Sequence, residues 1–162
     1  MRATLDHVGQ ILGSLPRILD VAIANGLTED SERGRKIAGW FFLNWCKDKR
    51  GELWMPFKMR LGYVPPTSPS VDYCVEKVLR IIQDNLRSSA ESRNPERNEW
   101  GGGIRAAKNL VMAFSGLPED ADEAVVLVAA VNAGLMTLDE AREIAALSGN
   151  QKFAPLLRMC IA

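Results

Sequence analysis

The side chains that could make or break covalent bonds are few and scattered in this sequence. The only histidine, His7, lies among apolar neighbours with no serine or cysteine motif close to it, so the sequence proposes no nucleophile for it to activate. The three cysteines lie far apart and lack the C-x-x-C spacing of a zinc site (Cys46, Cys74 and Cys160). We therefore expect a protein that is not an enzyme and that holds neither a metal nor another cofactor. Twenty acidic residues could still assemble an active site in space, which perturbed carboxylates clustered in a pocket would indicate.

Two short motifs imitate ligand-binding loops. Asp120 and Asp122 resemble the start of a calcium loop, but the glycine and the distal ligands are missing, so we interpret them as acids that favour a helix start. Glycines 101–103 precede a segment with Arg105 and Lys108, and glycines before a helix with cations one turn in can hold a phosphate. Their spacing matches neither common phosphate-binding motif, so a hinge that enters a helix is the alternative.

Charge is unevenly distributed along a chain whose net charge is zero. Residues 33–60 hold eight basic and two acidic residues, a net charge of +6, whereas residues 109–162 hold three basic and seven acidic residues, a net charge of −4. Aromatic residues are interleaved with the cations. The basic residues of the segment are Arg33, Arg35, Lys36, Lys47, Lys49, Arg50, Lys58 and Arg60.

The basic aromatic segment has two interpretations. Cations beside aromatic rings suit a nucleic acid, whose phosphates pair with Arg and Lys and whose bases stack. The helical spacing of Ile37, Phe41 and Trp45 instead indicates an ordinary hydrophobic core with solvated ends.

The function that we predict is a non-enzymatic protein–protein interaction module, such as an adaptor, an inhibitor or an assembly subunit. Its partner-binding residues would be aromatic anchors in loop-like contexts and neighbouring cations, namely Trp54, Phe57, Trp100, Lys47, Lys49 and Arg50. The partner is another protein or a second copy of the chain, whose acidic end could bind the basic end head to tail. The alternative is RNA or DNA bound through residues 33–60, with phosphate contacts from Arg33, Arg35, Lys36, Lys58, Arg60, Arg105 and Lys108.

No apolar run reaches the roughly 18–20 residues that span a bilayer, and the first residues do not resemble a signal peptide. An odd number of dispersed cysteines is typical of a reducing compartment. We therefore expect a cytoplasmic protein without a membrane partner.

Apolar residues recur at helical spacing in most of the sequence, which predicts an all-α bundle of six to eight helices. Two short helices separated near Pro16 are expected first, then a central helix that includes residues 37–46, and further helices at 70–86, 104–115, 119–133, 137–148 and 153–161. Residues 51–69 contain four prolines and could form either a strand or a loop. The polar stretch 87–103 would connect an N-terminal unit, residues 1–86, to an acidic C-terminal unit, residues 104–162, although a single domain is an alternative.

The segment TLDEAREIAALSGN, residues 137–150, resembles the first helix and turn of a helix-turn-helix of the excisionase or MerR-like kind. That resemblance implies a following recognition helix with apolar anchors and cations that face DNA. Here Lys152 stands at an expected anchor, Pro155 interrupts the second helix, and the surroundings are acidic. We therefore interpret the segment as an ordinary helical hairpin.

Overall fold

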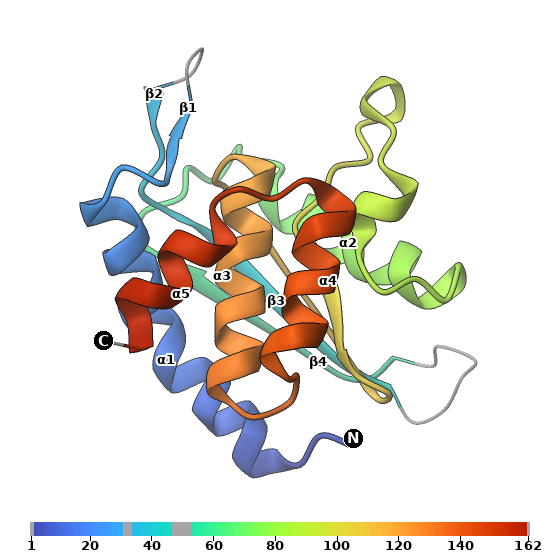
Figure 1. Cartoon of the computed structure of the whole chain (residues 1–162). Helices are drawn as coiled ribbons and strands as arrows, with labels where there is room; N and C mark the ends of the chain where they lie inside the picture. The colour runs from blue at the N-terminus through green and yellow to red at the C-terminus, as the bar shows by residue number, and fades with distance from the viewer. Residues whose placement is uncertain (1, 31–33, 47–52, 162) are drawn as a thin grey trace.

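The chain is a mixed α/β protein in a computed structural model that describes residues 2–30, 34–46 and 53–161 (Figure 1). The prediction of an all-α bundle is wrong, because these residues form two antiparallel sheets as well as five α-helices. The helices are α1 (Leu5–Ala24), α2 (Ser70–Gln83), α3 (Glu119–Asn132), α4 (Leu138–Ser148) and α5 (Phe153–Ile161), with short 3-10 helices η1 (Ser89–Ser92) and η2 (Pro95–Arg97). The strands are β1 (Glu29–Asp30), β2 (Gly34–Arg35), β3 (Gly39–Cys46), β4 (Leu53–Leu61), β5 (Gly103–Ala107) and β6 (Leu110–Ser115).

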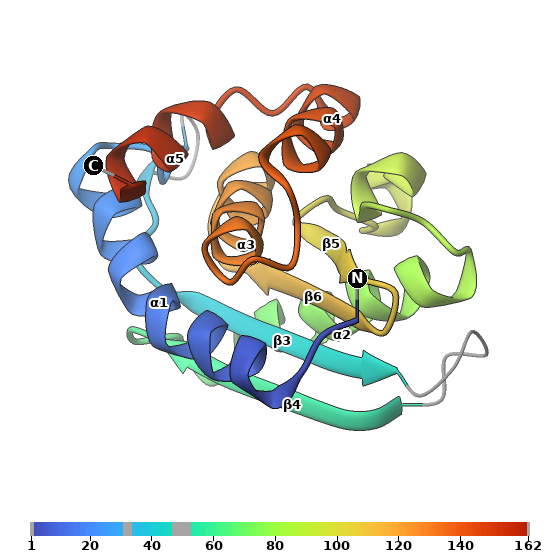
Figure 2. The ribbon, with the colours of Figure 1, turned by 60° about the horizontal axis from the view of Figure 1, so that its bottom comes forward.

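The main sheet has four antiparallel strands in the order β4-β3-β6-β5, and helices cover both of its faces. Helix α2 packs on one face, whereas α1 and α3 pack on the other, with α4 and α5 outside α3 (Figure 2). The central pair of strands joins β3 to β6, so each predicted unit contributes strands to one sheet.

Strand β3 occupies the segment for which a central helix was predicted, and that prediction is wrong. Phe41 and Leu43 pack into the core beneath α1 and α3, whereas Phe42 points to the opposite face and packs near α2. A strand covered on both faces needs apolar residues at every position, so its sequence lacks the polar–apolar alternation of a half-exposed strand. A short run of this kind cannot be distinguished from a buried helix by periodicity.

The predicted helix at 104–115 is also wrong, because this segment forms the hairpin β5–β6. Ile104 pairs with Met112, and both lie in the core on the α3 side. The strands turn at Lys108 and Asn109, between the end of β5 and the start of β6. The apolar residues whose helical spacing predicted a helix at 104–115 therefore lie on two paired strands.

The other helices agree with the sequence more closely. Helix α1 is continuous through Pro16, so the prediction of two short helices is wrong there. Helices at the predicted positions 70–86, 119–133, 137–148 and 153–161 are confirmed, with boundaries that differ by a few residues at most. In α4 the capping box of Thr137 and Glu140 is formed, and Gly149 ends the helix with φ +67°.

A buried carboxylate fastens the outer helices to the core. Glu123 on α3 is 2% exposed and accepts a 2.7 Å hydrogen bond from Ser88 and a 2.9 Å bond from the Asn150 amide. The Ser148 hydroxyl at the end of α4 also donates to Glu123. Buried polar groups are tolerated when they are hydrogen-bonded in this way.

Candidate ligand-binding site

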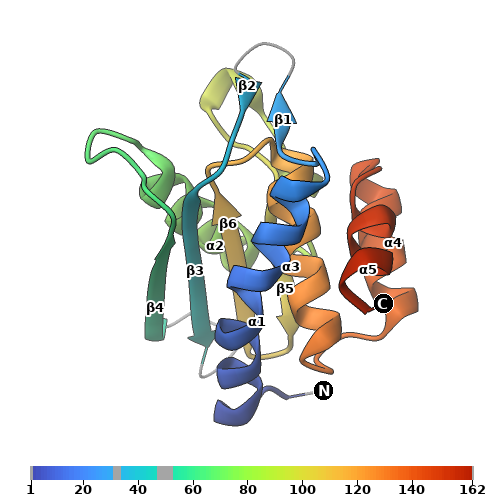
Figure 3. The ribbon, with the colours of Figure 1, turned by 90° about the vertical axis from the view of Figure 1, so that its left-hand side faces the viewer.

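The ends of several elements converge where β6 finishes. Helix α2 begins at Ser70 on one face of the sheet, and α3 begins at Glu119 on the other, four residues after β6 ends at Ser115. The small hairpin β1–β2 lies at the same end of the molecule as the tip of β6 (Figure 3). Helix N-termini carry unpaired N–H groups and a partial positive charge. Polar side chains are therefore expected at this end.

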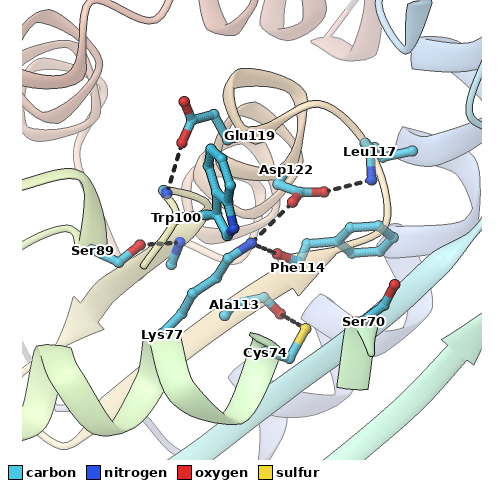
Figure 4. Close-up of polar contacts among 12 residues, drawn as sticks. Ser70, Cys74, Lys77, Ser89, Trp100, Ala113, Phe114, Leu117, Glu119 and Asp122 are labelled. Carbon is cyan, nitrogen blue, oxygen red and sulfur yellow. Dashed lines mark hydrogen bonds and ion pairs between the residues drawn. The ribbon is translucent and has the colours of Figure 1, made fainter. Parts of the chain in front are cut away.

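A lysine–aspartate pair is buried at this junction (Figure 4). Lys77 extends from α2 to Asp122 on α3, with 3.0 Å between Nζ and Oδ2 and side-chain exposures of 2% and 3%. The ammonium also donates to the Phe114 carbonyl at 2.8 Å, and the other Asp122 oxygen accepts from the Leu117 N–H at 3.0 Å. The pair therefore ties both helices to the end of β6.

The glycines 101–103 let the backbone approach this pair. Gly102 has φ +105°, and a Cβ atom there would lie 2.6 Å from Cβ of Asp122 and 2.8 Å from Nζ of Lys77. The Gly103 N–H donates to the Ser89 hydroxyl at 2.9 Å, and the Gly101 N–H donates to Glu119 at 3.0 Å. The triplet leads into strand β5, whose first residue is Gly103, rather than into a helix. It lets the backbone pass close to the ion pair, which a residue with a Cβ atom at position 102 would not allow.

An open cavity of about 750 Å³ lies above the pair. Its walls come from the β1–β2 hairpin, the start of α2, Trp100 and the connection from β6 to α3. The lining residues are Asp30, Lys36, Ser68, Pro69, Ser70, Tyr73, Lys77, Trp100, Ser115, Gly116, Leu117, Pro118, Glu119, Asp120 and Asp122. A volume of this size lies within the usual range for small-molecule sites.

Burial perturbs the titration of the cavity's innermost carboxyl. Burial raises the pKa of Asp122 to about 6, although the Lys77 ammonium and the Leu117 N–H favour its charged form. Glu119 on the same helix adds a smaller repulsion that also raises this pKa. A carboxyl that titrates near neutral pH in a cavity is a candidate for a functional site.

The arrangement is suited to holding a ligand rather than to nucleophilic attack. Burial raises the pKa of Cys74, whose thiol is fully buried and donates to the Trp40 carbonyl at 2.9 Å, so it is not a reactive thiolate. Ser115 has no hydrogen-bonded base among the described residues. Within the same ranges, no group of three potential ligands could hold a metal ion, and Asp120 pairs with Lys152.

The structure brings two of the residues proposed from the sequence into this cavity. Trp100 is half-buried on its wall, with the Arg93 guanidinium 5.5 Å from its ring centroid. Lys36 is also half-buried and lines the opposite side, next to β2. Arg35 is close in sequence but donates to the Ile23 carbonyl at 2.8 Å.

The remaining proposed residues lie elsewhere. Phe57, Lys58 and Arg60 are exposed on the edge strand β4, away from the cavity lining. Arg105 donates to the Ile81 and Leu86 carbonyls and thereby satisfies the C-terminal end of α2, while Lys108 is exposed in the β5–β6 turn. Four of the predicted cations and the side chain of Trp54 lie outside the described residues (Arg33, Lys47, Lys49 and Arg50).

Sequence reasoning missed Lys77 and Ser115, and it interpreted Asp122 only as an acid at a helix start. A signal existed for Lys77, which is three residues after Cys74 and four before Ile81 on the buried face of α2. Asp122 similarly opens a stretch of α3 that is buried on all sides. A charged residue at a buried helical position needs a partner, but the sequence does not show which one.

Comparisons of the chain with models of known protein families, with curated proteins and with solved structures find no match. Within the described residues, no helix combines the length and the apolar character that crossing a membrane requires. Function must therefore be inferred from the geometry of the cavity.

Proposed function

We propose that this chain is a binding domain for a small polar molecule, which occupies the cavity above Lys77 and Asp122. The observation that carries the proposal is a buried ion pair at the floor of an open cavity of about 750 Å³. Ligand sites typically combine a concave surface with a few convergent polar groups and perturbed titration. All three features meet here.

A contribution to the stability of the fold does not by itself explain why this ion pair is buried. Removing two charges from water is costly, and a buried ion pair is often no more stabilising than apolar residues of similar volume. A purely structural pair would also be expected to be sealed by apolar side chains. The two side chains are only 2% and 3% exposed, yet the cavity above them is lined by polar residues such as Ser70 and Ser115 and is not filled with apolar side chains. This arrangement is explained if the ion pair holds in place the groups that contact a ligand.

The proposal is tested by recording amide NMR spectra of the chain with a library of small charged and neutral fragments. Binders should shift the amides of Trp100, Gly116 and Leu117, which line the cavity. Ser70→Trp places a bulky ring in the cavity and should weaken binding by about tenfold or more. Asp72→Trp is the matched control, since Asp72 is exposed in the same turn of α2 and does not line this cavity. Fragments that bind only elsewhere, or equally well to Ser70→Trp, would refute the proposal.

We propose protein–protein interaction through self-association as a second candidate, because β4 is an edge strand with exposed cations. Lys58 and Arg60 are exposed there, and Glu140 and Glu143 are exposed on α4, so opposite charges could meet between copies. Pro56 within β4 disfavours direct pairing of edge strands, so the contact would involve side chains. Sedimentation over a salt series tests this candidate. Association at low salt that is lost in Lys58→Glu supports it, and an unchanged monomer at high concentration contradicts it.

A further inference from the structure

We infer that the ligand of this cavity carries a compact anionic group, a carboxylate or a phosphate, held between Lys77, Ser115 and the first turn of α2. This inference rests on the proposed function and specifies the chemistry of the ligand. It follows from the hydrogen-bonding capacity that the described residues leave unused at the floor of the cavity.

The unused capacity consists of donors. An ammonium has three N–H donors, and Lys77 uses two of them, on the Phe114 carbonyl and on Asp122. Ser115 is 5% exposed and lines the cavity, and its hydroxyl makes no hydrogen bond with any described residue. A ligand oxygen in the cavity would accept hydrogen bonds from both residues.

The start of α2 adds positive potential at the same place. The Ser70 N–H donates to the Ser68 hydroxyl at 3.3 Å, and the N-cap, Pro69, supplies no side-chain hydrogen bond to the N–H groups that follow. In the first turn of α3, by contrast, the Asp120 carboxylate accepts from the Ala121 N–H at 2.9 Å. Helix N-termini that face a ligand favour negative charge. Lys36 contributes a second cation at the cavity wall and makes no ion pair with a described residue.

The acidic residues of the lining do not oppose an anion as strongly as their number suggests, because each has a partner. Glu119 pairs with Arg93 at 2.7 Å, Asp120 pairs with Lys152 at 3.0 Å, and Asp122 pairs with Lys77. Asp30 is also partnered. Trp100 and Tyr73 provide aromatic surface for the rest of the ligand.

The experiment uses four probes that share one aromatic ring and differ in charge: benzoate, phenyl phosphate, benzamide and benzamidine. Affinities are measured by NMR titration of the cavity amides in the full chain. Benzoate or phenyl phosphate should bind about tenfold or more tightly than neutral benzamide, and cationic benzamidine should bind most weakly. The comparison of the two anions identifies the carboxylate or the phosphate as the preferred group.

Variants separate a binding role from a structural one. Ser115→Ala removes a hydroxyl that has no hydrogen-bond partner among the described residues, so it should weaken anion binding by about threefold to tenfold without changing the unfolding midpoint. Lys36→Met should weaken anion binding by a similar factor. Lys108→Met is the control, because this exposed cation lies in the β5–β6 turn outside the cavity, and it should leave affinity unchanged.

The outcomes distinguish the inference from the proposal on which it rests. Benzamidine or benzamide binding in the cavity as tightly as the anions would overturn the anionic ligand and leave the cavity proposal standing. Anion binding that is unaffected by Ser115→Ala and Lys36→Met would overturn the assigned subsite. No shift of the cavity amides with any probe or library fragment would overturn both.

Discussion

Replacing Lys77 with methionine tests whether the buried ion pair organises the end of the sheet. The substitution keeps most of the side-chain volume on α2 but leaves Asp122, which is 2% exposed, without its cation at 3.0 Å. The Phe114 carbonyl also loses its donor. Breaking a buried pair from one side costs about 3–5 kcal/mol, so we expect a loss of that size in the free energy of unfolding near neutral pH.

The loss in the free energy of unfolding that Lys77→Met causes should become smaller as the pH is lowered. Because burial raises the pKa of Asp122 from 3.8 to about 6, the folded chain binds the proton more tightly than the unfolded chain. The stabilisation linked to this proton is fully present below 3.8 and disappears as the pH rises through about 6. Without the Lys77 ammonium the pKa of Asp122 rises further. Protonation then removes the unpaired charge, so the cost of Lys77→Met should shrink on acidification.

The assay is urea unfolding followed by circular dichroism, at neutral pH and about two pH units lower. Lys108→Met is the control, since this exposed lysine in the β5–β6 turn should change stability by no more than about 0.5 kcal/mol. The double variant Lys77→Met with Asp122→Asn should be more stable than Lys77→Met alone at neutral pH. It carries no unpaired charge and retains an acceptor for the Leu117 N–H. A cost for Lys77→Met below about 1 kcal/mol, or one independent of pH, would refute the reasoning.

Three further substitutions test other contacts. Glu123→Ala should destabilise the fold by about 1–3 kcal/mol in urea unfolding, because the buried Ser88 hydroxyl loses its acceptor and Ser148 and Asn150 each lose one of theirs, whereas alanine at the exposed Glu143 should cost under about 1 kcal/mol. Gly102→Ala should lower the thermal midpoint and cost about 1–3 kcal/mol, since φ is +105° and its Cβ would collide with α3; an unchanged midpoint would contradict the close approach. Arg105→Met should cost about 1–2 kcal/mol and speed amide exchange at the end of α2, while Lys108→Met changes neither.

Sequence patterns predicted the elements whose ends have local chemical signals. Helix α4 is bounded by the Thr137 capping box and by Gly149, and both signals act within a few residues of the helix that they end. The strands had no such signals. Phe41 and Phe42 are both buried, on opposite faces of a sheet that is covered on both sides, so the alternation that marks a strand is absent.

The candidate site was harder to predict than the fold because its partners are distant in sequence. Lys77 and Asp122 are 45 residues apart, and only the packing of α2 and α3 on opposite faces of the sheet brings them together. Trp100 was singled out as an aromatic residue in a polar stretch, and it lies on the cavity wall. Its neighbours there depend on tertiary structure, which a local pattern does not encode.

The measurement that tests the central claim most directly is a crystal structure of the chain grown with the tightest-binding probe. We expect density for the probe in the cavity above the ion pair, with an acceptor atom within hydrogen-bond distance of Lys77 Nζ and Ser115 Oγ. An empty cavity in crystals saturated with the probe, or density confined to another surface, would contradict it.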